Sequence, residues 1–372
     1  MNYHNDIRTV MTLDAGGTNF VFSAIQANRE IVPPITMPAE ANDLDKSLNN
    51  IVQGFTKVKD ALKTKAVAIS FAFPGPADYP AGIIGDLGNL PGFRGGVALG
   101  PMLEEKFQVP VFINNDGDLF AYGESISGFL PEVNKLLEDA GSPKRYKVLF
   151  GVTLGTGFGG GIVRDGELFI GDNSAAGEIW ILRHKFERDC FVEEGVSIRA
   201  VKRVYSKISG APIDVCPEPK DIFNIAEGKI PGNKEAAITA FNTMGEVIGD
   251  ALANASTLVD GLVVIGGGLA GAGKLFMPAI VKEMNGVLKT LGGNPVPRME
   301  TKAFNLEDEW ERALFLKGEA KQVKVPGTDK TVAYDPLKRI GIGLSRLGAS
   351  KAIAVGAYAF ALNSLDKREI SE

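Results

Sequence analysis

Apolar positions along the chain follow two patterns, one typical of buried strands and one typical of amphipathic helices. Short apolar runs predict strands in TVMTLDAGG, FVFSAIQ, AVAISFAF, VPVFINND, YKVLFGVTL and GLVVIGGG. Helical spacing or composition predicts helices over 43–63, 119–129, 234–258, 273–289 and 350–362. Residues 300–335 are charged and irregular, and we expect surface structure there. Strands and helices mix throughout, which predicts an α/β fold.

Composition narrows the class of protein. The chain has 372 residues, of which 45% are hydrophobic, and this length favours two domains over one. A net charge of −5 argues against nucleic acid as the main partner. Two cysteines exclude a disulfide scaffold. The start lacks the order of a signal peptide and no apolar run is long enough to span a bilayer, so we expect a cytoplasmic protein without a membrane partner.

The stretch TLGTGFGGGIV has the G-x-G-x-x-G spacing of a dinucleotide-binding loop at Gly155, Gly157 and Gly160. That function requires a strand before the loop and a helix after it. Here the loop is followed by Ile162 and Val163 and then by an Asp-Gly turn, which is a hairpin signature. The context therefore argues against NAD.

A glycine hairpin can instead bind phosphate, because backbone N–H groups approach the anion closely and Thr hydroxyls add donors. LDAGGTNF near the start of the chain has the same plan of strand, Gly-Thr loop and strand. Asp14 in that segment suggests a divalent metal, since a bare carboxylate would repel phosphate. A tight turn without a ligand is the structural alternative for each loop.

Four polar residues further along the chain are candidates for catalysis or sugar binding. Asp116 ends a strand in VFINND, where it is a candidate base or, alternatively, a helix N-cap. Asn115 precedes it, and Glu178 lies in a segment of small residues that gives little reason for a charge. Glu193 is either a surface residue or one of several acceptors that would suit the hydroxyls of a sugar.

Several segments, in one order along the chain, resemble the ROK family of sugar kinases within the actin, hexokinase and Hsp70 superfamily. LDAGGTNF and TLGTGFGGGIVRDGELFIGDNSAAGE are similar to the family's two phosphate motifs, and FINNDGDLFAYGE to its Asn-Asp motif. PGPADYPAGIIGDLGNLPGF resembles the sugar-side loop, EEGVSIRA a second sugar-binding segment, and GLVVIGGGLAGAGKLF the adenosine motif. The resemblance implies a two-domain actin-like ATPase fold of the ribonuclease H type, with a nucleotide and sugar cleft between the lobes.

The resemblance also implies a role for each matching residue. ATP with Mg²⁺ is expected at Asp14, Gly16, Gly17, Thr18, Thr153, Gly155, Thr156, Gly157, Gly266, Gly267 and Gly268. Asp14 would hold the Mg²⁺ indirectly, and Asp116 would be the catalytic base for a sugar hydroxyl. The sugar is expected at Gly82, Asn89, Asn115, Glu178 and Glu193. The expected lobes are 1–120, completed by a C-terminal helix over 350–368, and a larger lobe over 121–349.

The chain departs from the family pattern just after Glu178. The family usually has a His that binds zinc and touches the sugar, and Ile181 stands at that position here. The Cys-rich zinc knuckle is reduced to Cys190. A structural zinc needs about four ligands, which His184 and Cys190 cannot supply, so we expect no zinc site. The missing His also leaves the identity of the sugar open.

These observations predict an ATP-dependent kinase for a hexose or a hexose derivative. One alternative is a non-catalytic sugar-binding or regulatory protein on the same scaffold, suggested by the altered segment 178–181. The other is an ATPase or scaffolding relative of actin, which the sugar-side loop disfavours. Some family members carry an N-terminal helix-turn-helix, but few residues precede the first strand here, so nucleic acid is not an expected partner. Family members are often dimers or tetramers, which makes a homodimer an expected state.

Overall fold

The computed structural model describes residues 3–371, which form two compact units. Within the described residues, unit 1 contains the chain up to Ser127, Gly166–Ala176 and the chain from Ser350 onward. Unit 2 contains Gly128–Asp165 and Gly177–Ala349. The expected lobes placed 166–176 in the second lobe, and the structure places this segment in unit 1. The reason is that Glu167 binds two residues of the C-terminal helix, accepting a hydrogen bond from Asn363 at 3.2 Å and pairing with Lys367.

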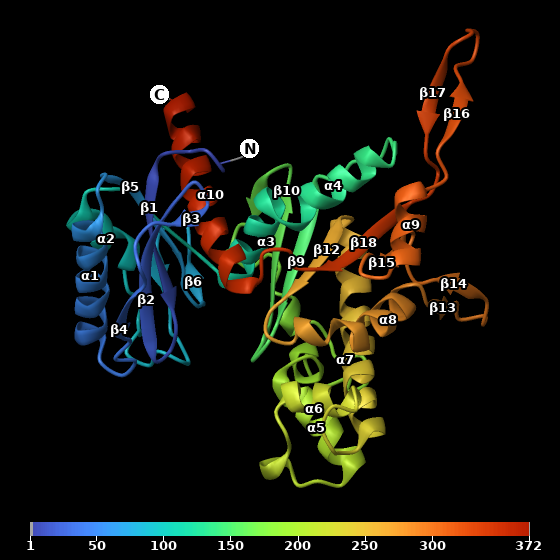
Figure 1. Cartoon of the computed structure of the whole chain (residues 1–372), viewed down its shortest axis with the longest axis horizontal. Helices are drawn as coiled ribbons and strands as arrows, with labels where there is room; N and C mark the ends of the chain where they lie inside the picture. Colours follow the sequence, from blue (N-terminus) through green and yellow to red (C-terminus); the bar gives the residue numbers. More distant parts are fainter. Residues whose placement is uncertain (1–2, 372) are drawn as a thin grey trace. The chain divides into compact units, whose positions relative to one another are not determined.

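Unit 1 is built on a sheet with the strand order β3-β2-β1-β5-β8, in which β4 also pairs with β2 (Figure 1). The strands within unit 1 are β1 (Thr9–Ala15), β2 (Asn19–Gln26), β3 (Arg29–Glu30), β4 (Ile35–Pro38), β5 (Ala66–Ala72), β6 (Ala77–Asp78), β7 (Ile83–Ile84), β8 (Val111–Asn114) and β11 (Glu167–Phe169). Strands β6 and β7 pair only with each other. Its helices are α1 (Leu44–Ala61), α2 (Leu99–Phe107), α3 (Asp116–Ser127) and α10 (Ala349–Ser371). Strands β1, β5 and β8 are mutually parallel, so their carboxyl ends lie at one edge of the sheet.

Helices cover both faces of this sheet. Helix α1 begins where the Asp43 side chain accepts a hydrogen bond from the Lys46 N–H at 3.1 Å. Its buried stripe includes Phe55, whose ring lies 5.0 Å from that of Phe22 on β2. On the other face, a smaller cluster joins Ala72 of β5 to residues of α3 and α10. The sheet edge is therefore held rigidly between two helical layers.

Unit 2 is built on a sheet in which β10, β9, β12, β18 and β15 are neighbours in that order. Its strands are β9 (Val148–Leu154), β10 (Phe158–Arg164), β12 (Leu262–Gly266), β13 (Val287–Lys289), β14 (Pro295–Pro297), β15 (Lys302–Asn305), β16 (Lys321–Lys324), β17 (Thr331–Tyr334) and β18 (Arg339–Leu344). Its helices are α4 (Phe129–Asp139), α5 (Ile198–Ser209), α6 (Pro219–Ala226), α7 (Lys234–Val259), α8 (Gly273–Met284) and α9 (Glu309–Lys317), with 3-10 turns η1 (Ile179–Ile181), η2 (Val192–Gly195), η3 (Ile213–Val215) and η4 (Ala270–Ala272). Strands β9, β12, β18 and β15 are parallel, and β10 is antiparallel to β9.

Two expectations for unit 2 are wrong. The helix expected over 273–289 ends at Met284, because the Asn285 side chain both donates to and accepts from the backbone of Ala303 at 2.8 Å and so ties the chain to β15. The segment 300–335 is not irregular. It contains β15, whose residues Ala303 and Phe304 are buried in unit 2, as well as α9 and the hairpin of β16 and β17.

The mixture of strands and helices confirms the α/β class predicted from the sequence. Among the described residues, no helix is both long and apolar enough to cross a bilayer.

Candidate active site

In unit 1, three candidate residues lie at the carboxyl edge of the parallel strands. Asp14 near the end of β1 is in register with Ala72 at the end of β5, and Ala72 is in register with Asn114 at the end of β8. Asn115 and Asp116 follow Asn114 directly. The carboxyl edge of a parallel sheet is where α/β proteins place ligands. The fold thus brings Asp14 to the same edge as Asn115 and Asp116, although Asp14 is distant from them in the sequence.

Asp116 is the first residue of α3, and its carboxylate is only partly used by the protein. One oxygen accepts a hydrogen bond from the Gly117 N–H at 2.8 Å, and the Asn115 side-chain oxygen accepts from the same N–H at 2.8 Å. The Asn115 amide also donates to the Tyr79 hydroxyl at 3.5 Å. Asp116 can therefore cap the start of α3 and also act as a base, because capping uses only one of its two carboxylate oxygens.

The pKa of the Asp116 carboxyl is raised above the ordinary Asp value. Crowding by protein atoms is the main cause, and the negative charge of Asp14 adds to it, while the Gly117 N–H acts in the opposite direction. The residue nevertheless keeps an exposed surface. A carboxylate that is both crowded and open to solvent is a stronger base than an ordinary surface Asp and can still reach a substrate.

The first glycine loop connects β1 to β2. The Gly16 N–H donates to the Asn19 carbonyl at 3.0 Å, which closes the turn. Within the described chain, the N–H groups of Gly17 and Thr18 have no acceptor in the protein, and the Asp14 carboxylate has no partner. A Cβ on Gly17 would lie 3.6 Å from the carbonyl oxygen of Asn89, so the sugar-side loop lies directly beside this turn.

The second glycine loop connects β9 to β10. The Gly155 N–H donates to the Gly157 carbonyl at 3.0 Å, and in the part of the chain that the structure describes the N–H groups of Thr156 and Gly157 lack an acceptor. The loop is followed by β10 and then by a turn in which Asp165 and Gly166 have φ of 52° and 81°. The expected hairpin is confirmed, and the helix that a dinucleotide site needs is absent at this place.

The end of β12 lies beside the second loop. Gly266 is in register with Thr153 on the parallel neighbour β9. Gly267 has φ of 90°, and a Cβ there would overlap the Leu154 carbonyl oxygen and lie 2.6 Å from the Leu154 nitrogen. Only glycine fits this close approach of two backbones. Gly268 is exposed and has open space around it.

These contacts predict different effects for two adjacent glycines. Gly267→Ala is expected to lower the free energy of unfolding by about 2–4 kcal/mol, because backbone strain and overpacking add. Gly268→Ala has neither problem and is expected to stay within about 0.5 kcal/mol of wild type. Urea unfolding of both variants measures the difference, and equal stabilities would contradict the packing described for β9 and β12.

Glu193 is held against the second loop. Its Oε2 accepts a hydrogen bond from the Phe158 N–H at 3.0 Å, and a Cβ on Gly157 would lie 2.8 Å from the same oxygen. Arg199 on α5 donates to Glu193 at 3.4 Å and to the Thr156 carbonyl at 3.4 Å. Glu193 stays a sugar-binding candidate from the sequence, and Arg199, which contacts it, was not among the predicted residues. The only signal for Arg199 was its position shortly after Glu193, at the start of an amphipathic helix.

Glu178 is exposed and precedes η1. The Trp180 indole N–H donates to its carboxylate, and the Trp180 ring meets the Phe191 ring edge-on with centroids 5.6 Å apart. Ile181, at the position of the family's His, is 61% exposed. Trp180 therefore holds the carboxylate of Glu178, which is a candidate residue for binding the sugar.

His184 organises the loop that precedes η2. Its Nδ1 accepts hydrogen bonds from the N–H groups of Phe186 and Glu187 at 3.1 and 3.0 Å, and burial lowers the pKa of its imidazole. Cys190 is exposed. Among residues 3–371 there is no group of three or more His, Cys, Asp or Glu side chains arranged to hold a metal ion.

Gly82 differs from the other residues expected at the sugar, because the packing of the chain alone explains why a glycine stands there. It is buried with φ of 65°, its N–H donates to Tyr79 and its carbonyl accepts from the Gly100 N–H at 2.9 Å. Both backbone groups are thus already bonded inside the protein.

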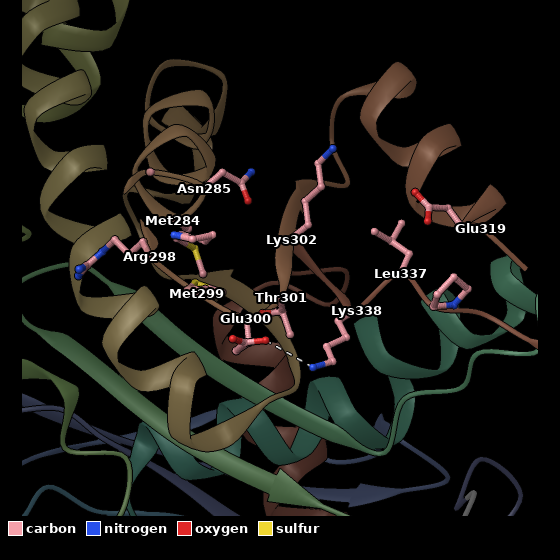
Figure 2. A pocket seen from close by; sticks show the side chains of 13 residues that line it. Met284, Asn285, Arg298, Met299, Glu300, Thr301, Lys302, Glu319, Leu337 and Lys338 are labelled. Atoms are coloured by element: carbon pink, nitrogen blue, oxygen red, sulfur yellow. Dashed lines mark hydrogen bonds and ion pairs between the residues drawn. The ribbon is translucent and has the colours of Figure 1, made fainter. Parts of the chain in front are cut away.

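Unit 2 also has a pocket of about 560 Å³ at the opposite edge of its sheet (Figure 2). Lys302 and Lys338 line it near the amino ends of β15 and β18, whereas the second glycine loop follows the carboxyl end of β9. Because these strands are parallel, the pocket is separate from the loop. Glu300 and Lys338 form an ion pair of 3.4 Å within it.

Comparisons with known proteins show the family to which this fold belongs. A model of the ROK family matches residues 10–308. The chain belongs to the ROK family. A solved structure of a glucokinase from Parabacteroides distasonis is 59% identical, with a TM-score of 0.91 over 98% of this chain and 99% of that one. Membership confirms the resemblance found in the sequence and the actin-like α/β fold that it implied.

Two further relatives are kinases that are named for different sugars. A glucokinase from Halalkalibacterium halodurans is 27% identical over 73% of this chain and 84% of its own length. An N-acetyl-D-glucosamine kinase from Photobacterium profundum is 32% identical over 45% of this chain and 50% of its own length.

Proposed function

We propose that this ROK family protein transfers the γ-phosphoryl group of ATP to a hydroxyl of a hexose or hexose derivative, most often the 6-hydroxyl in such kinases. The enzyme class has broad support, because the relatives named above are glucokinases and an N-acetylglucosamine kinase. The observation that carries the proposal is the combination of unsatisfied backbone donors in two glycine loops with the crowded, solvent-accessible carboxylate of Asp116.

The phosphates of ATP suit the free donors of the two loops. Backbone N–H groups at Gly17, Thr18, Thr156 and Gly157 have no acceptor among the described residues, and the Thr hydroxyls add further donors. Each loop offers two adjacent free N–H groups, and anions bind such groups well. Gly268, with open space around it, suits the close approach of the adenosine part. ATP is thus a phosphoryl donor that these residues are suited to bind.

Asp14 fits a role in holding the Mg²⁺ that accompanies ATP. Its carboxylate is exposed and has no partner in the described chain, and it repels Asp116 in the absence of a cation. Magnesium usually keeps several waters and binds one or two carboxylates together with phosphates, so a single Asp is sufficient. When bound, the ion would neutralise charge that develops on the phosphates.

Asp116 would act as the base. It would take the proton of the sugar hydroxyl as the hydroxyl oxygen forms a bond to the γ-phosphorus and the bond from that phosphorus to the β–γ bridging oxygen breaks. The products are ADP, the sugar phosphate and the proton held by the carboxyl. Asn115 keeps the carboxylate in place through their shared bond to Gly117.

The remaining hydroxyls of the sugar are assigned to Asn89, Asn115, Glu178 and Glu193. Glu193 would have a second role, because its carboxylate also fixes the second glycine loop. Gly82 is left out, since its backbone groups are bonded within the protein.

The raised pKa of Asp116 predicts the acid side of the pH profile. A base works only when it is deprotonated, so kcat/KM is expected to fall as the pH drops through the pKa of this carboxyl, above the ordinary Asp value of about 3.9. Initial rates at saturating ATP from acid to neutral pH measure the position of this limb. A limb at or below the ordinary value would contradict the assignment of Asp116.

Trp180→Phe is expected to raise the KM for the sugar about two- to tenfold with little change in kcat, because the exposed Glu178 carboxylate loses its indole donor. Phe191→Leu leaves that hydrogen bond in place and is expected to keep KM within about twofold. Steady-state kinetics of both variants separates the hydrogen bond from the ring contact. An equal rise of KM in the two would assign the effect to packing instead.

Release of ADP from ATP, measured with a panel of hexoses and N-acetylhexosamines, tests the proposed function. Release that depends on a sugar supports the kinase and identifies its substrate. Binding of a sugar without turnover supports the regulatory alternative, which the altered segment 178–181 suggests. Hydrolysis that is independent of any sugar supports an actin-like ATPase.

A further inference from the structure

The hairpin of β16 and β17 extends away from the body of unit 2 (Figure 1). We call residues 319–335 the arm. Every residue of its two strands is exposed. A two-stranded hairpin is only marginally stable in water unless something packs on it. The arm therefore raises the question of what covers it.

The two faces of the arm differ in chemistry. Residues directly opposite each other in the ladder share a face, so Val323 and Val332 lie on the same side as Lys321 and Tyr334. This apolar face is open to solvent, with Val323 38%, Val332 54% and Tyr334 51% exposed. The other face carries Gln322, Lys324, Thr331 and Ala333. Alternation of this kind is typical of a hairpin with one covered face.

The base of the arm is firmly anchored. The Asp335 carboxylate accepts hydrogen bonds from the N–H groups of Glu319 and Leu337 at 3.1 Å, which joins the two ends of the arm. It also forms a 2.6 Å ion pair with Arg339, whose side chain is completely buried. The arm is thus presented from a rigid base, as a docking element needs to be.

A second exposed surface lies on the neighbouring helix α9. Trp310 is 72% exposed there, next to the exposed acidic residues Asp308 and Glu309 at the start of the helix. Of the twenty-one large hydrophobic residues that are exposed in the described chain, four lie on α9 and the arm, namely Trp310, Val323, Val332 and Tyr334. Such a concentration of apolar surface is typical of a protein interface. The pocket of Figure 2 lies at the base of the arm, where Glu319 and Leu337 line it.

The charges of the two surfaces are complementary. Between the two acids at its base, Glu319 and Asp335, the arm carries Lys321, Lys324 and Lys330 against one acid, Asp329. Two arms packed face to face would repel each other, whereas an arm over the acidic start of α9 would be attracted. Since one chain carries both surfaces and leaves both exposed, they can satisfy each other between two copies.

We propose that the arm is a docking element for a second copy of this chain, in which the apolar face of each arm packs over Trp310 and the acidic start of α9 of the other copy. A two-fold axis uses both surfaces twice and leaves neither exposed. Lys321, which lies on the apolar face, then faces the acids of α9 of the second copy.

The test compares two adjacent substitutions on β17 in the full-length protein. Val332→Asp puts a charge on the apolar face, and Thr331→Asp puts the same charge on the other face. Sedimentation velocity across a range of concentrations is expected to show a wild-type dimer, a dissociation constant raised about tenfold or more for Val332→Asp, and little change for Thr331→Asp. Thermal unfolding verifies that both variants are folded.

Charge reversal tests the identity of the partner surface. Glu309→Lys and Lys321→Glu are each expected to weaken the dimer, and the double variant to regain part of the loss. A monomeric wild-type protein, or equal effects of Val332→Asp and Thr331→Asp, would overturn the proposal. These readouts measure assembly and do not depend on catalysis.

Discussion

Asp116→Asn is expected to reduce kcat for sugar phosphorylation by about 10²–10⁴-fold, the usual contribution of a positioned base. Asn has the size of Asp and can still accept the Gly117 N–H, so the start of α3 is expected to remain intact. Because the sugar is assigned to other side chains, its binding is expected to change little. Coupled measurement of ADP release gives the rate, and calorimetric titration gives the affinity for the sugar.

A matched control separates this effect from general loss of carboxylates. Asp45 is exposed in the first turn of α1, and Asp45→Asn is expected to retain wild-type kinetics. A kcat for Asp116→Asn within a few fold of wild type would remove Asp116 from the role of base. Loss of sugar affinity in parallel with kcat would instead give it a binding role.

Asp335→Ala is expected to lower the free energy of unfolding by about 3–5 kcal/mol, because it leaves a completely buried Arg339 without its partner. It also removes the acceptor for the Glu319 and Leu337 N–H groups. Asp329→Ala, at the exposed tip of the same arm, is expected to change stability by less than about 0.5 kcal/mol. Chemical denaturation of the two variants and wild type measures the difference.

The pH dependence of stability gives an independent test of the same pair. Burial raises the pKa of the Asp335 carboxyl, but the Arg339 guanidinium and the two N–H donors outweigh it, and the pKa is lowered. A lowered pKa means that the ion pair stabilises the fold above the ordinary Asp value of about 3.9 and is lost as the pH falls below it. The difference in free energy of unfolding between the wild type and Asp335→Ala is therefore expected to shrink in acid. A difference that stays constant with pH would contradict this.

The layout of the candidate site could largely be predicted from the sequence because its elements are local. The glycine loops, Asp14 and Asp116 all lie at or directly after the ends of short apolar strands, and a strand that runs into glycines constrains the backbone strongly. The hairpin after Gly160 was predictable for the same reason, since Ile162, Val163 and the Asp-Gly turn are contiguous. The residues that come after a glycine loop predicted the structure of the loop better than the spacing of its glycines did.

Other features depend on contacts distant in sequence and could not be predicted. The bonds from Glu193 to Phe158 and from Arg199 to Thr156 span thirty-five and forty-three positions. Segment 166–176 belongs to unit 1 through Glu167, which pairs with residues almost two hundred positions away. The arm was taken for irregular surface structure because its apolar residues are few and are interrupted by lysines, as suits a face that the chain itself does not cover.

The products of one turnover test the central proposal most directly. Incubation with ATP, Mg²⁺ and the sugar that stimulates ADP release, followed by phosphorus NMR, measures ADP, sugar phosphate and inorganic phosphate together. We expect one sugar phosphate for each ADP and almost no inorganic phosphate, because the γ-phosphoryl group goes to the sugar hydroxyl. Inorganic phosphate equal to ADP, without a sugar phosphate, would contradict a sugar kinase.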